Sequence, residues 1–299
     1  MCYSVVEKDE LKIRFFRYCG EYYDSEIEQI YLRARYYDPS LGRFTQQDPA
    51  MADGNNWYVY CSNNPINYKD PTGYWEEGDE NLPVWAQAVI SYYTTEWITA
   101  NEKNDSETMA FAHQQAESAR TAVADGYVPG IILDVPVISQ KPYEYRCTPT
   151  AGAMVDAFYH PNDSMDSSTI TQEVYNSLGI DVDRRPGLWP EEMVGIVDYS
   201  ISKYDTNLPF YPFPGYHSIT GEINNGNPII FVVLWSNGGG HSMVITGYVT
   251  INGVNGVIYN DPWTGEQNFL PYSEMSSEDG VEQSYNTGTW SYSYPTNQN

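Results

Sequence analysis

The sequence predicts an α+β fold in which helices precede an antiparallel sheet. One observation is a helix-favouring run that begins at Cys147, ahead of every long apolar strand candidate. Another is a set of β-rich runs after residue 228, separated by glycine-containing turns, which is typical of antiparallel strands. The third is a small, aromatic and turn-rich block at the start of the chain. We therefore predict three parts, over residues 1–75, 76–126 and 127–299.

Composition and charge exclude several classes of protein. The 299 residues include 15 basic and 40 acidic side chains, which give a formal net charge of −25. A surface this negative repels nucleic acids and anionic membranes, so we expect neither as a partner. The sequence lacks the run of roughly 18 apolar residues that a membrane span needs. The charged segment Met1–Arg14 also lacks the apolar region of a signal peptide.

The cysteines do not indicate a disulfide framework or a metal site. There are four of them, widely scattered, and no pair has metal-ligand spacing. The acidic residues likewise do not follow the spacing of a calcium-binding loop. We expect no metal and no cofactor. The cysteines are Cys2, Cys19, Cys61 and Cys147.

The first 75 residues have the pattern of short aromatic strands joined by turns. A segment of this size with so many turns buries little apolar surface alone, so we expect it to be part of something larger. Strands are expected over 22–24, 30–37 and 57–60, and turns over 38–42, 63–65 and 70–73.

The motifs of this block resemble the Rhs repeat-associated core domain, which ends the YD-repeat shells of polymorphic toxins. The resemblance covers about residues 15–75 and implies that a toxin or effector module follows Gly73. It also implies a parent chain that supplies the shell, an immunity protein, and secretion or delivery to a target cell. Self-cleavage, if it occurs, is expected near Tyr74–Trp75. The motifs are Gly20–Asp24, Tyr31–Phe44, Asp48–Pro49 and Tyr58–Gly73.

Two helices are expected between the predicted core fragment and the second half. Pro83 suits the first turn of a helix, and apolar residues from Trp85 to Tyr92 follow at helical spacing. Asp105 or Ser106 is expected to cap a second helix, which Gly126 ends. The acidic stretch before Pro83 is interpreted as a linker.

The second half alternates helix signals with strand signals. A helix is expected from Cys147, a second from a capping box at Thr169 to Leu178, and a third from Pro190. The dipeptide Asn252–Gly253 predicts a hairpin between the last two of three strands. These strands are expected over 229–235, 242–248 and 254–259.

Cys147 has the position of an activated nucleophile. Its place at a helix N-terminus puts the thiol at the positive end of the helix dipole, which lowers its pKa toward the thiolate. Pro149 fits the first turn because its missing N–H has no partner there in any case. The alternative interpretation is a small buried apolar side chain.

Three further residues complete a catalytic pattern. His241 follows three glycines at the start of one strand, and Asp261 ends the next strand. Two adjacent antiparallel strands can hold an imidazole and a carboxylate side by side, which leaves the other ring nitrogen for Cys147. Gln140 lies seven positions before Cys147 and can donate to an oxyanion beside the Cys147 backbone N–H. Taken singly, each residue also fits an ordinary loop or turn position.

The motifs around these residues resemble the papain-like peptidases of the C39 and C39-like group. The resemblance spans about residues 131–270 and implies Cys147 as nucleophile, His241 as general base and acid, Asp261 as the group that orients the ring, and Gln140 in the oxyanion hole. Thr148 departs from the family, which has glycine there, and the Gln-to-Cys spacing is about one residue longer. The motifs are 134–140, 147–152, 226–230, 240–248 and 259–262.

The two resemblances together predict a cysteine peptidase effector attached to an Rhs core, with a protein or peptide as substrate. The same triad can also carry out deamidation or transamidation, because these reactions share an acyl-enzyme. A non-catalytic binding module on a papain-like scaffold is the remaining alternative.

Overall fold

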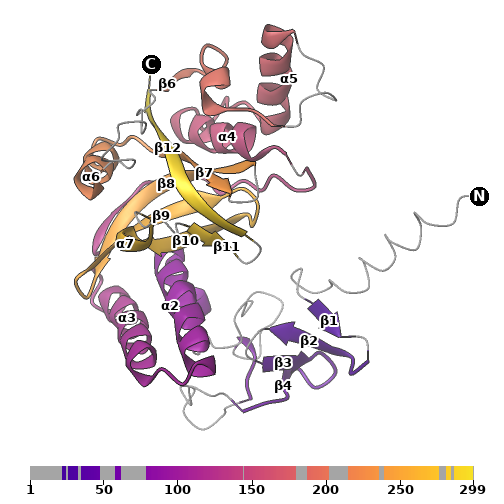
Figure 1. Ribbon diagram of the computed structural model, residues 1–299, viewed down its shortest axis with the longest axis vertical. Helices are drawn as coiled ribbons and strands as arrows, with labels where there is room; N and C mark the ends of the chain where they lie inside the picture. The colour runs from indigo at the N-terminus through magenta and orange to yellow at the C-terminus, as the bar shows by residue number, and fades with distance from the viewer. Residues whose placement is uncertain are drawn as a thin grey trace, which may run out of the picture. The chain divides into compact units, whose positions relative to one another are not determined.

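The computed structural model divides into two compact units, residues 1–125 and 126–299, which are described separately (Figure 1). The residues that the structure describes are 22–24, 26–32, 35–47, 58–61, 79–143, 145–179, 187–201, 215–235, 239–275, 281–283 and 286–298.

The first unit contains a small antiparallel sheet in the order β1-β2-β3-β4. Residues 30–37, predicted as one strand, form two strands instead, with Ile30 paired to Tyr37. The buried positions explain the error, because Ile30 and Leu32 are followed by Arg35 and Tyr37, so the alternation shifts by one residue. The strands are β1 (Tyr22–Asp24), β2 (Gln29–Leu32), β3 (Arg35–Asp38) and β4 (Arg43–Phe44).

The expected strand over 57–60 is also wrong in its described part. Within residues 58–61 the structure has only an isolated bridge between Val59 and Arg43. Tyr60 nevertheless joins the core of the sheet, where its ring contacts the rings of Tyr37 and Phe44. The buried guanidinium of Arg35 lies 3.6 Å from the centre of the Phe44 ring. The expected turns over 63–65 and 70–73 lie outside the described residues.

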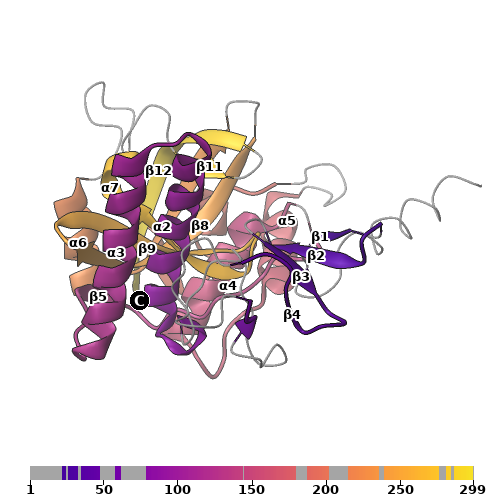
Figure 2. The same cartoon turned by 90° about the horizontal axis from the view of Figure 1, so that it is seen from below.

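A helical hairpin follows in the same unit (Figure 2). It consists of α2 (Val84–Glu102) and α3 (Ser106–Ala124), after a short 3-10 turn, η3 (Asp79–Asn81). Both predicted starts are confirmed, because Pro83 precedes α2 and the Asp105 side chain caps α3 by accepting from the Thr108 N–H at 3.1 Å. Small buried side chains on α3 let the two helices approach closely.

The second unit is built on an eight-stranded antiparallel sheet in the path order β10-β9-β8-β7-β12-β11, with β5 beside β8 and β6 beside β12. The strands are β5 (Gly130–Ile132), β6 (Tyr199–Ile201), β7 (Ile229–Trp235), β8 (Gly240–Ile251), β9 (Val254–Asp261), β10 (Glu266–Pro271), β11 (Val281–Gln283) and β12 (Asn286–Gln298).

The central strands follow the sequence pattern closely. The first five residues of β7 are all buried, as expected for a strand covered on both faces. Asn252 and Gly253 both have positive φ, at 43° and 81°, so the predicted hairpin between β8 and β9 is confirmed. Strand β8 extends beyond its predicted bounds at both ends and begins at Gly240.

Helix α4 covers part of the sheet (Figure 1). Its buried residues share one apolar core with α5, with η5 and with β7 and β8. The helical elements of this unit are α4 (Cys147–Tyr159), α5 (Ser167–Leu178), η5 (Pro190–Met193), α6 (Tyr216–Asn224) and α7 (Tyr272–Met275).

Two predicted helix starts need correction. The cap of helix α5 is Asp166, three residues before the expected cap at Thr169, because the Asp166 carboxylate accepts from the N–H groups of both Ser168 and Thr169 at 2.8 Å. The segment from Pro190 is a single 3-10 turn, whose cap is the Glu192 carboxylate on the Trp189 N–H at 2.7 Å. The predicted end of α5 is confirmed by Gly179, at φ 64°.

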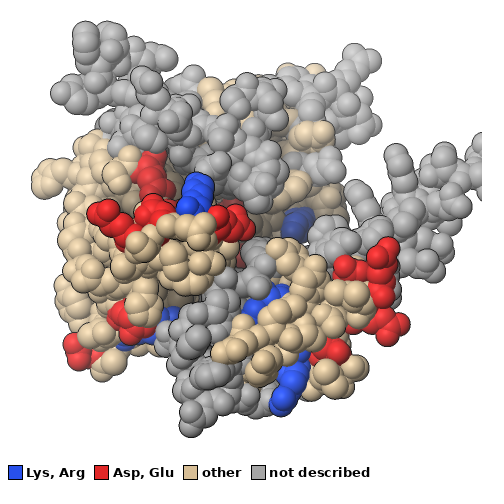
Figure 3. Space-filling model, turned by 60° about the horizontal axis from the view of Figure 1, so that its bottom comes forward, with Lys and Arg blue, Asp and Glu red and all other residues tan. Residues whose placement is uncertain are grey.

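These elements confirm the α+β class, with helices ahead of an antiparallel sheet. Within the described part of the chain, no helix is long and apolar enough to cross a bilayer. On the face drawn in Figure 3, the described acidic side chains cover more of the surface than the basic ones, in line with the net charge.

Candidate active site

Cys147 occupies the first position of α4. The first backbone hydrogen bond of this helix runs from the Thr150 N–H to the Arg146 carbonyl at 3.0 Å, and Pro149 has no N–H to satisfy. Cys147 is half-buried as a residue, and its thiol group is desolvated by the surrounding protein. A thiol at a helix N-terminus lies at the positive end of the dipole, which favours the thiolate.

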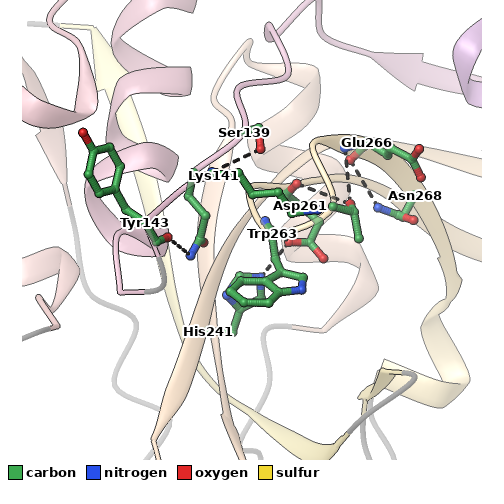
Figure 4. Close-up of polar contacts among 10 residues, drawn as sticks. Ser139, Lys141, Tyr143, His241, Asp261, Trp263, Glu266 and Asn268 are labelled. Carbon is green, nitrogen blue, oxygen red and sulfur yellow. Dashed lines mark hydrogen bonds and ion pairs between the residues drawn. The ribbon is translucent and has the colours of Figure 1, made fainter. Parts of the chain in front are cut away.

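His241 and Asp261 meet across neighbouring strands (Figure 4). His241 is the second residue of β8, Asp261 is the last residue of β9, and the two strands pair antiparallel. The His241 Nε2 lies 2.6 Å from the Asp261 Oδ1, and both side chains are buried. A charge-assisted hydrogen bond this short fixes the plane of the ring and its protonated nitrogen.

A tight turn after β9 holds the carboxylate in place. The Trp263 backbone N–H donates to the same Asp261 Oδ1 at 2.7 Å (Figure 4). The Asp261 carbonyl accepts from the Gly265 N–H at 2.8 Å and closes the turn. Gly265 has φ 69°, a left-handed conformation that glycine adopts without strain. The side chain therefore faces the ring with two donors on one oxygen.

The thiol and the imidazole form a hydrogen-bonded pair. Since Nε2 of His241 is engaged by Asp261, the Nδ1 nitrogen is the one left for the sulfur. Burial opposes ionisation of the thiol. The hydrogen bond and charge of His241 and the Ser242 N–H outweigh burial, and together they lower the pKa of Cys147 below its usual value.

The pKa of the His241 imidazole is shifted in the opposite direction. Burial favours its neutral form, but hydrogen bonds to Asp261 and Cys147 and the negative charge of both groups raise the pKa of His241 to about 10. A lowered thiol pKa beside a raised imidazole pKa describes a thiolate–imidazolium pair. The Trp235 ring is nearly parallel to the imidazole, with its centre 6.3 Å away.

Gln140 lies in the turn region that also holds Asp261. Its backbone N–H donates to the Pro262 carbonyl at 2.8 Å, and its buried side chain donates from Nε2 to the Tyr143 carbonyl at 2.9 Å. The loop that leads into α4 is thereby tied to the turn after β9.

Hydrogen bonds thus connect three of the predicted residues, Cys147, His241 and Asp261, while Gln140 is attached through Pro262. Sequence reasoning missed the hydroxyls of Thr148 and Ser242 and the Trp263 N–H. Their only signal was adjacency in the chain to the predicted residues.

The described residues offer little to a metal ion. Among them, no group of three or more His, Cys, Asp and Glu side chains could hold one. The groups that the site brings together are a thiolate, an imidazolium and a carboxylate.

The sequence match to known families agrees with this geometry. A model described as the Peptidase_C39 like family matches residues 132–289, more than half of the chain. This chain belongs to the Peptidase_C39 like family. The matched segment of this family member contains every predicted site residue, from Gln140 to Asp261.

Short matches connect the chain to a protein named as a tRNA nuclease and to one named as a toxin. The tRNA nuclease WapA of Bacillus subtilis is 44% identical over 72 residues, which is 22% of this C39-like chain and 3% of the relative. Toxin protein Tse5 of Pseudomonas aeruginosa is 45% identical over 58 residues, 19% of this chain and 4% of the relative. The chain therefore spans only a few per cent of the length of these relatives.

Solved structures give weaker similarities. A chain from a study of the mite allergens Blo t 1 and Der p 1 has a TM-score of 0.38 at 12% identity, covering 56% of this chain and 70% of the other. Digestive procathepsin L 3 of Tenebrio molitor larval midgut has a TM-score of 0.32 at 13% identity, covering 70% and 90%. Similarity at this level carries no conclusion about chemistry.

Proposed function

We propose that this member of the Peptidase_C39 like family is a cysteine peptidase that acts on a protein or peptide substrate. The observation that carries the proposal is the hydrogen-bonded series from the Cys147 thiol through His241 to Asp261. A low-pKa thiolate next to a protonated imidazole is the arrangement that activates a cysteine nucleophile.

The reaction follows from the protonation states of the pair. The Cys147 thiolate attacks the scissile carbonyl carbon, and the carbonyl π electrons move to oxygen. His241 then gives its proton to the leaving amine as the C–N bond breaks, which leaves a thioester and a neutral imidazole. The imidazole removes a proton from water, water attacks the thioester, and the thiolate leaves beside the restored imidazolium. Asp261 stabilises the imidazolium throughout.

The oxyanion is assigned to two donors. The backbone N–H of Cys147, at the start of α4, is one of the helix N–H groups that have no partner inside the helix. The amide of Gln140 is the second donor, because an amide N–H beside the nucleophile can stabilise the oxyanion. The bond from the Gln140 N–H to Pro262 supports this role because it anchors the residue beside the catalytic turn.

The biological setting is a further part of the proposal. We infer that residues 1–75 are the end of an Rhs core, 76–126 a helical linker, and 127–299 the effector. Partial identity to a protein named as a toxin supports this setting. A YD-repeat shell in a parent chain, secretion or delivery into a target cell, and an immunity protein follow from it.

The test is cleavage of peptide libraries by the protein and by its Cys147→Ala variant. We expect the variant to lose turnover completely while its circular dichroism stays that of the parent. Cys61→Ala is the matched control, because Cys61 is a partly exposed cysteine of the other unit, and it should cleave at the parent rate. Undiminished cleavage by Cys147→Ala would refute the proposal.

Product mass separates the alternative reactions of the same triad. Hydrolysis of a peptide bond gives two fragments, whereas deamidation leaves the chain uncut and adds about one dalton, as expected when water replaces an amide nitrogen in an acyl exchange. A Cys147-dependent gain of this size without cleavage would replace peptidase by deamidase as the assigned activity.

A further inference from the structure

The hydroxyl of Thr148 connects the first turn of α4 to the start of β8. Its Oγ1 donates to the Leu188 carbonyl at 2.6 Å and lies 2.7 Å from the Ser242 Oγ. Both hydroxyl side chains are buried, each residue being 2% exposed. Thr148 directly follows Cys147, and Ser242 directly follows His241. This hydrogen bond therefore lies one residue from each member of the thiol–imidazole pair.

The direction of the hydrogen bonds follows from the number of protons. A threonine hydroxyl has one hydrogen, and the Leu188 carbonyl can only accept. If Thr148 donates to Leu188, its contact with Ser242 must be a bond in which Ser242 is the donor. The result is a directed series from Ser242 through Thr148 to the Leu188 carbonyl, and such a buried series is rigid when every member is satisfied.

Ser242 also contacts the sulfur. Its backbone N–H donates to Cys147, and this contact favours the thiolate. Ser242 thus acts on the site twice, through its backbone N–H to the sulfur and through its hydroxyl to Thr148. A glycine at position 148, which the C39-like resemblance leads one to expect, has no side chain to contact Ser242 or Leu188.

We propose that Thr148 and Ser242 are positioning residues that hold the Cys147 sulfur against the His241 ring. The proposal rests on the proposed function, in which these two groups are the nucleophile and the base. Without the link, α4 and β8 remain packed through apolar side chains, but the Ser242 N–H and the His241 ring are no longer held at a fixed distance from the sulfur, and these are the groups that keep it ionised. Neither hydroxyl takes part in bond making.

The test measures how readily Cys147 is alkylated as pH rises, in the full chain, with the modified peptide followed by mass spectrometry. We expect Thr148→Val to move the midpoint of thiolate formation upward by about one pKa unit, so that alkylation below the midpoint slows about tenfold. Thr148→Ser keeps the hydroxyl and should restore most of the parent rate. Thr171→Val, a buried threonine on α5 whose hydroxyl bonds only within that helix, is the matched control and should behave as the parent.

A second variant keeps the test independent of folding defects at position 148. Ser242→Ala removes the donor from the strand side and should shift the midpoint in the same direction. Because the two hydroxyls form one link, the double variant should be no slower than the slower single variant. Additive losses in the double variant would contradict a shared positioning link.

The readout distinguishes this proposal from the proposed function. A lowered midpoint in the parent with no change in Thr148→Val and Ser242→Ala would overturn the positioning role and leave the peptidase proposal standing. An ordinary midpoint in the parent itself would overturn both. A lowered parent midpoint that rises in both variants supports the positioning role, whether or not a peptide substrate is cleaved.

Discussion

At the scale of single residues, one oxygen of Asp261 controls the site. It accepts from His241 at 2.6 Å and from the Trp263 N–H at 2.7 Å, so the carboxylate has little freedom to rotate. Its charge supports the imidazolium, and the imidazolium supports the thiolate. The charge of Asp261 thereby acts on the pKa of the Cys147 thiol through the His241 ring.

Asp261→Asn tests this dependence. Asparagine keeps an acceptor for the ring and for the Trp263 N–H but carries no charge. We expect the pKa of His241 to fall, the pKa of Cys147 to rise, and turnover near neutral pH to drop about tenfold to a hundredfold, since each pKa unit is worth about tenfold. Steady-state kinetics over a range of pH would measure the drop in turnover and the two pKa changes.

Asp166→Asn is the control for Asp261→Asn. Asp166 caps α5 by accepting backbone N–H groups, which the side-chain oxygen of asparagine does equally well. This variant should therefore keep the parent kinetics. Unchanged turnover in Asp261→Asn would remove the charge of residue 261 from the mechanism.

The pH dependence has two limbs with opposite causes. Activity should rise as Cys147 loses its proton, at a pH below the ordinary pKa of a thiol, and fall as His241 loses its proton near pH 10.

The raised imidazole pKa stabilises the fold at low pH, and this contribution is lost as pH passes about 10. The lowered thiol pKa contributes above the ordinary thiol pKa, and this contribution is lost as pH falls.

Profiles of kcat/KM and of unfolding free energy against pH would check both limbs. In Cys147→Ala, His241 loses a partner that raises its pKa, so the alkaline loss of stability should begin at lower pH than in the parent. If the free energy of unfolding of this variant falls at the same alkaline pH as that of the parent, the ion pair is contradicted.

At the scale of elements, sequence signals worked where the chemistry was local. Pro83, Asp105 and Gly179 mark helix ends through their own dihedral angles or side chains, and Asn252–Gly253 needs only its positive φ angles to form the hairpin. These signals failed where the conformation of a segment depends on the elements that pack or pair with it. Strand β12 contains Pro295 and buried Ser293 and Thr296, and it is a strand because β7 pairs with it.

The cap of α5 gives a stability prediction at this scale. Asp166→Ala leaves the N–H groups of Ser168 and Thr169 without their carboxylate, so the free energy of unfolding should fall by about 1 kcal/mol. Asp163→Ala removes an exposed carboxylate of the preceding turn and should change stability much less. Urea denaturation of the three proteins measures the difference, and equal midpoints would contradict the cap.

At the scale of the whole molecule, the sequence indicated which residues form the catalytic series but not which contacts hold them in place. Cys147, His241 and Asp261 were predicted because each follows a recognisable helix or strand boundary. The bond between Thr148 and Ser242 joins residues 94 positions apart, and neither has a special pattern around it. Contacts of this kind depend on how α4 lies on the sheet, which local patterns do not specify.

The division of the chain gives the last prediction. Every group that sets the state of Cys147 belongs to residues 126–299, and the family match lies inside the same unit. The fragment 126–299 should therefore fold cooperatively by itself and alkylate Cys147 with the same pH midpoint as the full chain. A fragment that carries His241→Ala should fold equally well but show a higher midpoint. If the fragment without this change folds and its thiol has an ordinary pKa, residues outside the second unit must contribute to the site.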